Sequence, residues 1–459
     1  MLSAPVEVQG PTTPLAVEID QRYLVIPEFT LENGAILTNA PVAFKTWGTL
    51  DRDRANVVLV SHPISGNANV AEWWGPLFGP GHTLDPTRYF IVCCNTIGSP
   101  YGTASPLTRK HGEMFTNGAW VRAPHIDKPM EQEEQMWWGA DFPSSTVRDD
   151  VRLHKCVLEY LGVEQLAAVI GGSMGGMAAL EWPLCFPVRH PSSPNAMAEA
   201  TPKDKPYVRA IVALASSARH SAWCIAWSEV QRRAVMADEK YNQGRYLLRD
   251  PPEKGLAAAR MCALMTYRQP QSFERRFSRL RGTTNVKKAA PRKLNPEASS
   301  LMEEGDEAPS PDILKQKQEQ DREQYAVQSY LYHHGNKFVK RFDALCYIHL
   351  TQKLDTHDAA RDRTSWTQDV DQSNSTAVLA QVLRYLGVAP VAPRVQILSV
   401  TSDLLYTPNE QEFVHASIPK SALVHIESPE GHDGFLLEYP QIEAAIRPFL
   451  HTDVSTSKL

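Results

Sequence analysis

The feature that most restricts the fold of this chain is a glycine-rich turn between a buried strand and a helix. The apolar run LAAVI leads directly into the turn GGSMGG at residues 171–176, and the helical pattern MAALEW follows. The turn fits G-x-S-x-G, in which a serine stands on a sharp bend above the carboxyl end of a sheet. Ser173 is therefore a candidate nucleophile. The alternative is a tight turn that only packs or binds an anion.

Buried strands recur along the chain as a parallel sheet requires. Short apolar runs, bounded by Gly, Pro and polar residues, occupy 57–62, 89–94, 166–172, 210–216, 395–403 and 423–428. Helical patterns separate several of them, notably at 146–161 and 174–185. Continuous hydrophobicity in strands that alternate with helices predicts an α/β fold, with a mostly parallel central sheet and helices on both faces.

The long segment between the strand patterns 210–216 and 395–403 has a different sequence pattern. Residues 221–380 contain helical patterns and few strand-like runs. We expect them to form a helical lid inserted into a core made of residues 1–220 and 381–459. Within the lid, residues 283–323 are rich in Lys, Glu, Pro, Ser and Gln and poor in large apolar side chains, which predicts a mobile loop.

A serine of this kind needs a base and an acid, which follow it in the chain order Ser, Asp, His. Asp403 ends one strand pattern, and His432 lies in the loop after the next. Both positions are at carboxyl ends of strands, where open α/β sheets place catalytic groups. Taken singly, each residue has an equally good structural explanation: Asp403 as a helix N-cap, and His432 as a solvated loop residue. Their order and placement together favour a catalytic triad.

Two backbone amides are the expected donors to an oxyanion. Met174 follows the candidate nucleophile directly, and Ile64 lies in the loop after the strand pattern 57–62. A nucleophile on a strand-to-helix turn uses amides at these two places. For Ile64 the alternative is an ordinary turn shaped by Pro63 and Gly66.

Composition excludes several classes of partner. The chain of 459 residues has 47 Lys and Arg against 52 Asp and Glu, a net charge of −5, so nucleic acid is not expected to bind. Its seven cysteines include no C-x-x-C pair, which favours a reducing intracellular compartment and neither a disulfide framework nor a thiolate metal site. No apolar run of about 18 residues or secretory leader is found, so we expect no membrane span.

The last three residues match a known targeting signal. Ser457-Lys458-Leu459 is the tripeptide that a peroxisomal import receptor reads at a free carboxyl terminus. It predicts peroxisomal import, and a cytoplasmic location is the alternative.

Long stretches of the chain resemble the homoserine O-acetyltransferase family, particularly its fungal members. These are acyltransferases of methionine biosynthesis with an α/β-hydrolase fold. The resemblance extends from Phe29 to about Leu450, and the matching stretches are AFKTWGTL, EWWGPLFGPGHTLDPTRYFIVCCNTIGSPYGTASP, TVRDDVRLHKCVLEYLG, GGSMGGMAALEW, SARHSAWCIAWSEVQRRAV, RFDALCYIHLTQKLDTHD, and VTSDLLYTPNEQEF with GHDGFLLEYPQ.

The resemblance implies an activity and a role for each site residue. The expected reaction moves an acetyl group from acetyl-CoA, a co-substrate, to the hydroxyl of L-homoserine in a ping-pong cycle, with no bound cofactor or metal. We also expect a homodimer. The implied roles are nucleophile for Ser173, its partners for Asp403 and His432, oxyanion hole for the amides of Ile64 and Met174, carboxylate recognition for Arg232, and amino-group recognition for Asp433.

The chain departs from the family pattern in two places, and the acceptor stays open. Relatives usually have H-A-L-[ST]-G where residues 62–66 read HPISG, and D-A-N-S-Y where residues 343–347 read DALCY. Neither change touches the triad. The alternatives are a related transferase that acts on L-serine or on a secondary-metabolite alcohol such as deacetylcephalosporin C, an esterase or thioesterase, and a non-catalytic binding protein.

Overall fold

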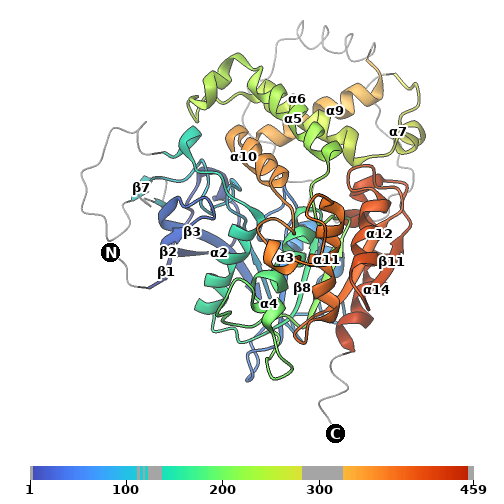
Figure 1. The fold of residues 1–459 in the computed structure, drawn as a ribbon. Coiled ribbons are helices and arrows are strands. Elements are labelled where there is room, and N and C mark those ends of the chain that lie inside the picture. Colours follow the sequence, from blue (N-terminus) through green and yellow to red (C-terminus); the bar gives the residue numbers. More distant parts are fainter. Residues whose placement is uncertain (1–3, 111–113, 117–118, 122–136, 282–323, 453–459) are drawn as a thin grey trace, which may run out of the picture.

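The centre of the molecule is a nine-stranded sheet (Figure 1). The computed structural model describes residues 4–110, 114–116, 119–121, 137–281 and 324–452. Along the sheet the strands follow the order β1-β2-β3-β5-β4-β8-β9-β10-β11. Their bounds are β1 Val6–Val8, β2 Arg22–Thr30, β3 Ile36–Trp47, β4 Val57–Ser61, β5 Phe90–Cys94, β8 Leu166–Gly172, β9 Ala210–Leu214, β10 Arg394–Val400 and β11 Ala422–Ile426.

The sheet is parallel from β5 to β11 and antiparallel at its other end. Neighbouring strands pair in parallel in the series β5, β4, β8, β9, β10 and β11. The strands β1, β2 and β3 pair antiparallel, and β3 joins β5 in the same way. All six predicted strands are present, so the predicted fold class is confirmed. The three antiparallel strands were not among those predicted.

Helices cover both faces of the sheet, because successive residues of each strand enter different cores. Val57 and Leu59 pack in one core and Val58 and Val60 in the other. The first core includes side chains of α2 (Val147–Tyr160), α3 (Met174–Cys185), α11 (Ser375–Val388) and α12 (Pro408–Ser417), and the second includes those of α14 (Tyr439–His451). The strands β4, β8, β9 and β10 are buried on both sides, as their continuous hydrophobicity predicts, whereas the edge strand β11 is partly exposed.

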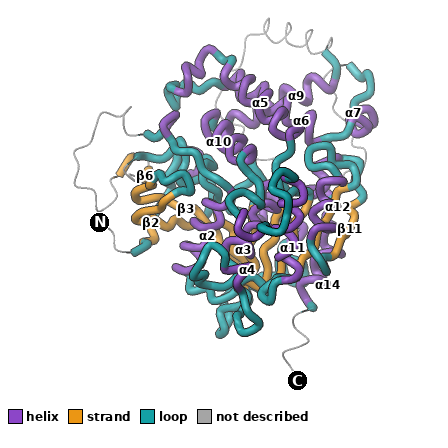
Figure 2. The backbone as a smooth tube through the Cα atoms, viewed as in Figure 1, coloured by secondary structure: helices purple, strands orange, loops and turns teal. Residues whose placement is uncertain are grey.

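A group of helices between β9 and β10 lies over one side of this core (Figures 1 and 2). It contains α5 (Ala222–Met236), α6 (Glu253–Tyr267), α7 (Pro270–Arg276), α9 (Ala326–Val339) and α10 (Ala344–Asp355). We call these helices the lid. The expected end of the insertion, residue 380, falls inside α11, which packs on the core. Residues 283–323, predicted to be a mobile loop, lie outside the described residues, as does the tripeptide 457–459.

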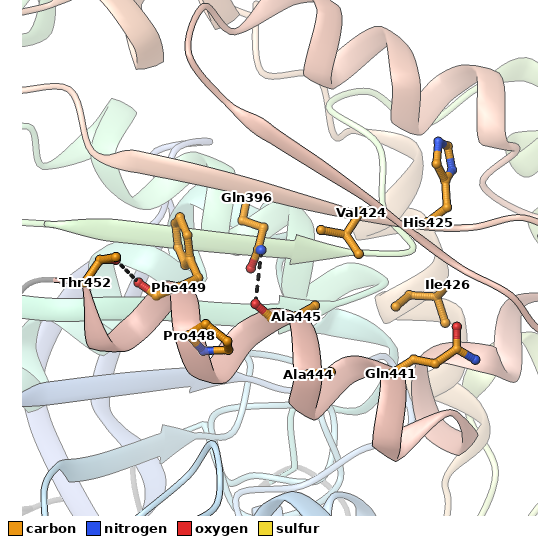
Figure 3. A pocket seen from close by; sticks show the side chains of 10 residues that line it. All are labelled: Gln396, Val424, His425, Ile426, Gln441, Ala444, Ala445, Pro448, Phe449 and Thr452. Carbon is orange, nitrogen blue, oxygen red and sulfur yellow. Dashed lines mark hydrogen bonds between the residues drawn. The ribbon is translucent and has the colours of Figure 1, made fainter.

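A shallow groove lies at the β11 edge of the sheet (Figure 3). Its walls come from β10, β11 and α14 and include Gln396, Val424 and Phe449. Gln396 joins β10 to α14 across the groove by donating to the carbonyl of Ala445 at 3.2 Å. The groove is distinct from the pocket around Ser173.

Candidate active site

Ser173 stands in a strained turn between β8 and α3. Its φ of 57° and ψ of −126° are far from any conformation that a non-glycine residue adopts easily. Two hydrogen bonds hold the turn. The Ser173 N–H donates to the carbonyl of Leu214 at 2.9 Å, and the Ser216 hydroxyl donates to the carbonyl of Ser173 at 2.8 Å. The end of the adjacent strand β9 and the loop that follows it therefore fix the position of Ser173.

Two glycines of the turn are required because backbone passes too close for a side chain. A Cβ atom on Gly171 would lie 2.1 Å from the carbonyl oxygen of Gly175. A Cβ atom on Gly175 would lie 2.0 Å from the carbonyl oxygen of Ser61, at the end of β4. The spacing G-x-S-x-G is thus a packing requirement of the turn and its neighbouring strand.

The structure brings Ser173, His432 and Asp403 into one hydrogen-bonded chain. His432 Nε2 is 3.0 Å from Ser173 Oγ, and His432 Nδ1 is 2.7 Å from Asp403 Oδ2. All three residues are buried. When Asp403 accepts a hydrogen bond from Nδ1–H, the imidazole presents Nε2 as an acceptor to the serine hydroxyl, which is the arrangement of a general base.

Asp403 and His432 are held by their own loops. Asp403 Oδ1 accepts hydrogen bonds from the N–H groups of Leu405 at 2.8 Å and Tyr406 at 3.0 Å, so both carboxylate oxygens are occupied. The His432 ring lies among aromatic side chains, with ring centroids 5.4 Å from Tyr406 and 5.1 Å from Phe435. These contacts leave the imidazole little freedom to turn away from the serine.

The two expected oxyanion donors follow the ends of the neighbouring strands β8 and β4. Met174 is the first residue of α3, so its N–H has no acceptor within the helix. Ile64 lines the pocket around Ser173. The peptide before Ile64 is held through its carbonyl, since Pro63 O is 2.8 Å from His62 Nδ1 and accepts from the Gly66 N–H at 2.8 Å. A planar peptide turns as one unit, so these bonds also fix the direction of the Ile64 N–H.

His62 is a buried part of this arrangement. Burial lowers its pKa to about 4, which leaves the imidazole neutral near pH 7. Its Nε2 accepts from the Thr96 N–H at 3.0 Å, so Nδ1 carries the proton that is donated to Pro63. Thr96 begins a turn that is fixed by Asp150. The Asp150 carboxylate accepts hydrogen bonds from the Ile97 N–H and from Lys353 Nζ.

The pocket around Ser173, which we call the Ser173 pocket, lies between core and lid. Its core wall includes Ser173, His432, the Pro63–Ser65 turn, Asp433, Phe435 and Leu436. Side chains from three lid helices form the opposite wall, and they include Trp227, Gln231, Arg260, Tyr267, Thr351 and Leu354. A substrate at Ser173 is therefore enclosed by residues from sequence regions far apart.

Arg232 is buried on α5 next to the pocket residues Ser228 and Gln231, but it is not itself part of the pocket wall. Its Nη2 is 2.7 Å from Asp355 Oδ2 and 2.9 Å from Glu229 Oε2. Its Nη1 is buried and has no hydrogen-bond partner within the described part of the chain. One donor of the guanidinium thus stays free for a further acceptor.

Asp433 lines the pocket next to His432. Burial raises the pKa of its carboxyl, and the nearby guanidinium of Arg268 opposes this rise. Arg268 Nε is 2.9 Å from Asp433 Oδ2. The carboxylate is therefore already partnered by one cation from the lid.

Several pocket residues were missed by the sequence interpretation. Arg260 and Tyr267 reach the wall from α6, and Gln231 is fixed there because it accepts from the Tyr347 hydroxyl at 2.5 Å. The helical pattern of the lid places these residues on helices but does not say which helix faces would meet the core. The unusual Leu345 and Cys346 precede the α10 residues Thr351 and Leu354 that line the pocket.

The described residues form neither a metal site nor a membrane-spanning helix. Among them, no group of three or more His, Cys, Asp and Glu side chains is placed to hold a metal ion. None of the described helices combines the length and apolar character needed to cross a membrane.

Comparison with known proteins defines the family. Residues 56–439 match the α/β hydrolase fold family. The chain is 40% identical to a homoserine O-acetyltransferase of Gibberella fujikuroi, over 97% of this chain and 91% of that protein. It is 39% identical to the homoserine O-acetyltransferase of Saccharomyces cerevisiae, over 94% and 87% of the two chains.

Solved structures agree with the fold. The crystal structure of homoserine O-acetyltransferase from Bacillus anthracis superposes with a TM-score of 0.65 at 18% identity, covering 98% of each chain. Esterase E22 gives the same TM-score at 21% identity, over 94% of this chain and 99% of the other. The protein is thus a member of the α/β-hydrolase family. Within it, the chain belongs to the family of the homoserine O-acetyltransferases, as the resemblance in the sequence indicates.

Proposed function

We propose that the protein transfers an acetyl group from acetyl-CoA to the hydroxyl of L-homoserine. The observation that carries the proposal is the continuous hydrogen-bonded chain of Ser173, His432 and Asp403 at the end of an enclosed pocket. Identity of about 40% with fungal homoserine O-acetyltransferases over nearly the whole chain supports the choice of reaction.

In the first half of the cycle His432 Nε2 takes the proton of Ser173 Oγ while the oxygen attacks the thioester carbon. The carbonyl oxygen becomes negative and is stabilised by the N–H groups of Met174 and Ile64. The carbon–sulfur bond then breaks, His432 returns its proton to the sulfur, and CoA leaves an acetyl-serine. Asp403 stabilises the imidazolium throughout this half.

In the second half the acceptor replaces CoA. His432 takes the proton of the homoserine hydroxyl, whose oxygen attacks the acetyl-serine through a second oxyanion. The bond to Ser173 breaks and the serine recovers a proton from His432. We assign the acceptor's carboxylate to the free Nη1 of Arg232 and its ammonium to Asp433, because these charges match.

The decisive experiment joins a covalent and a product measurement. Incubation with acetyl-CoA should add one acetyl group to the wild-type protein on the peptide that contains Ser173, and Ser173→Ala should remove both the label and the transfer activity. Label on another residue would refute the covalent step. A mixture of homoserine, serine and other hydroxyl compounds should yield mainly O-acetylhomoserine. Free acetate as the main product would identify an esterase instead.

Two further proposals concern the cellular context. We propose that the chain forms a homodimer, which light scattering on the purified protein tests by mass. We also propose import into peroxisomes through Ser457-Lys458-Leu459. A fluorescent protein that carries the last ten residues should coincide with a peroxisomal marker, and diffuse fluorescence of the intact fusion would refute this.

A further inference from the structure

The lid concentrates positive charge beside the Ser173 pocket. Residues 260–281 include six arginines and one glutamate, although the whole chain has a net charge of −5. This segment covers the second half of α6 and all of α7 (Figure 1). We call Arg260, Arg268, Arg275 and Arg276 the arginine cluster.

Three members of the arginine cluster lie close enough to act on one imidazole. Burial, followed by the positive charges of Arg260, Arg276 and Arg268 together with His333, lowers the pKa of His334 on α9 to about 4. His334 is therefore neutral near pH 7. Guanidinium groups gathered in this way repel one another, so an anion bound among them would stabilise the arrangement.

Carboxylates of the protein neutralise only part of this charge. Glu430 pairs with Arg268 and lies 3.9 Å from Arg275, and Asp433 pairs with Arg268. Within the described residues, no carboxylate lies within 4 Å of the guanidinium groups of Arg260 and Arg276. The positive charges of Arg260 and Arg276 are thus not neutralised by a contacting carboxylate of the described residues and are available to an external anion.

Aromatic rings hold these two arginines in place. The guanidinium carbon of Arg260 is 4.9 Å from the ring centroid of Phe338, and that of Arg276 is 4.9 Å from the centroid of Tyr330. A guanidinium that stacks on a ring keeps its N–H groups in the guanidinium plane, where they are available to phosphate oxygens. A purine base can also stack on these aromatic rings and on the guanidinium planes.

The cluster is continuous with the Ser173 pocket. Arg260 lines the pocket, and Arg268 pairs with Asp433, the pocket residue next to His432. Arg275 and Arg276 lie further along on α7, where their side chains are exposed. Positive charge therefore extends from the wall of the pocket to the surface of the lid.

We propose that the arginine cluster binds the nucleotide end of the acyl-CoA donor, with its 3′-phosphate and diphosphate groups. This inference rests on the proposed function. The long pantetheine arm would connect the nucleotide at the lid surface to the thioester at Ser173. Outside the turn at Ser173 the sequence has no glycine-rich phosphate loop, so side chains must supply the phosphate contacts.

The test compares two donors that differ only in the nucleotide. Arg276→Ala should raise the KM for acetyl-CoA about fivefold or more and change the KM for S-acetylpantetheine less than twofold. Arg245→Ala, which removes another exposed lid arginine, is the matched control and should change neither value. Thermal unfolding of both variants checks that they fold. Equal factors for the two donors, or no change with either, would overturn the proposal.

A binding measurement separates this inference from the proposed function. Adenosine 3′,5′-bisphosphate should bind the wild-type protein in calorimetry and bind Arg276→Ala at least fivefold more weakly. No acceptor or acyl transfer is needed, so an enzyme that failed to acetylate homoserine would still report on the cluster. Absence of binding to the wild type, or equal binding to both proteins, would overturn the proposal.

Discussion

At the scale of single residues, backbone strain is concentrated at Ser173. A non-glycine residue at its φ and ψ costs about 1–3 kcal/mol. The bonds from Ser173 N–H to Leu214 and from Ser216 to Ser173 O offset this cost. The result is a hydroxyl whose position is fixed by the sheet before any substrate arrives, which lowers the reorganisation needed for attack.

Arg232 offers a test of acceptor recognition. Arg232→Lys should raise the KM for homoserine at least tenfold and change the KM for acetyl-CoA far less, because an ammonium keeps the charge but loses the planar donor pair. Steady-state kinetics with each substrate varied in turn measures both constants. Equal effects on the two substrates would show that Arg232, through Asp355 and Glu229, only stabilises the lid.

His62 offers a test of the oxyanion loop. His62→Gln places its amide near the former Nε2 and removes one of the two donors to Pro63 O, so only the Gly66 N–H still holds the peptide that sets the direction of the Ile64 N–H. We expect acetylation of Ser173 to slow by about 30-fold or more with little change in the KM for acetyl-CoA, since a lost oxyanion donor costs about 10²–10³ in rate. Rapid-quench measurement of acetyl-enzyme formation gives this rate.

The control for this experiment is His62→Asn. Its side-chain amide lies near the former Nδ1 and can still donate to Pro63 O, so acetylation should stay within about fivefold of the wild type. Both variants remove a buried ring, and thermal unfolding should show similar losses of stability. If the two variants acetylate at the same rate, His62 acts only through packing.

At the scale of helices and strands, the buried parallel elements were predictable from sequence and others were not. Continuous apolar runs gave all six parallel strands, and the serine motif gave the start of α3. The strands β2 and β3 were not predicted because Pro27 and Pro41 interrupt their apolar runs, and proline argues against the interior of a strand. The two strands pair with each other locally, across residues 31–35, but β3 also pairs with β5, which lies far away in the sequence and is not contained in a local pattern.

The site residues likewise fall into those that were predictable from the sequence and those that were not. Ser173, Asp403 and His432 follow strand ends, so the sheet topology alone brings them together. Arg260 and Tyr267 reach the pocket only through the packing of α6 against α5 and α9, and nothing in their local sequence distinguishes them from a surface-facing turn of helix. Residues contributed by the lid therefore needed the structure.

An ion network joins three elements beneath the site. Glu181 on α3 is completely buried, 2.7 Å from Arg363 Nη2 and 3.3 Å from Arg148 Nε on α2. Burial acts to raise the pKa of Glu181, but the charges of Arg363 and Arg148 lower it to about 2. A carboxyl with a folded pKa below its unfolded value contributes stability above about pH 4.5, and this contribution is lost as the pH falls toward 2.

Glu181→Gln should therefore reduce the free energy of unfolding at pH 7 by about 3–5 kcal/mol, because two buried guanidinium groups lose their counter-charge. The difference from the wild type should shrink as the pH falls below about 4.5. Urea denaturation from pH 7 to the lowest pH at which the wild type folds measures both effects. Asp250→Asn, at an exposed pair with Lys240, is the control and should change stability little.

At the scale of the whole molecule, the lid must favour one nucleophile over another. Water and the homoserine hydroxyl are both able to attack an acetyl-serine, and water is far more concentrated. The triad is buried, and the lid helices α5, α6 and α10 complete the pocket above it. A transferase on an α/β-hydrolase fold thus depends on the closure of this wall as much as on the triad.

Trp227 tests this dependence because it lines the pocket while part of its side chain meets solvent. Trp227→Ala should open the wall and raise the ratio of acetyl-CoA hydrolysis to homoserine acetylation by about tenfold, which corresponds to about 1.4 kcal/mol between the two routes. Thiol release without acceptor gives the first rate, and mass spectrometry of O-acetylhomoserine gives the second.

The control is Trp223→Ala, which removes the neighbouring indole. That side chain is 53% exposed and packs edge-on at 5.7 Å against Trp227 outside the pocket, so the ratio should stay unchanged. If both variants shift the ratio equally, helix α5 has loosened as a whole; if neither does, the exclusion of water resides in the core wall and the lid serves only to bind substrates.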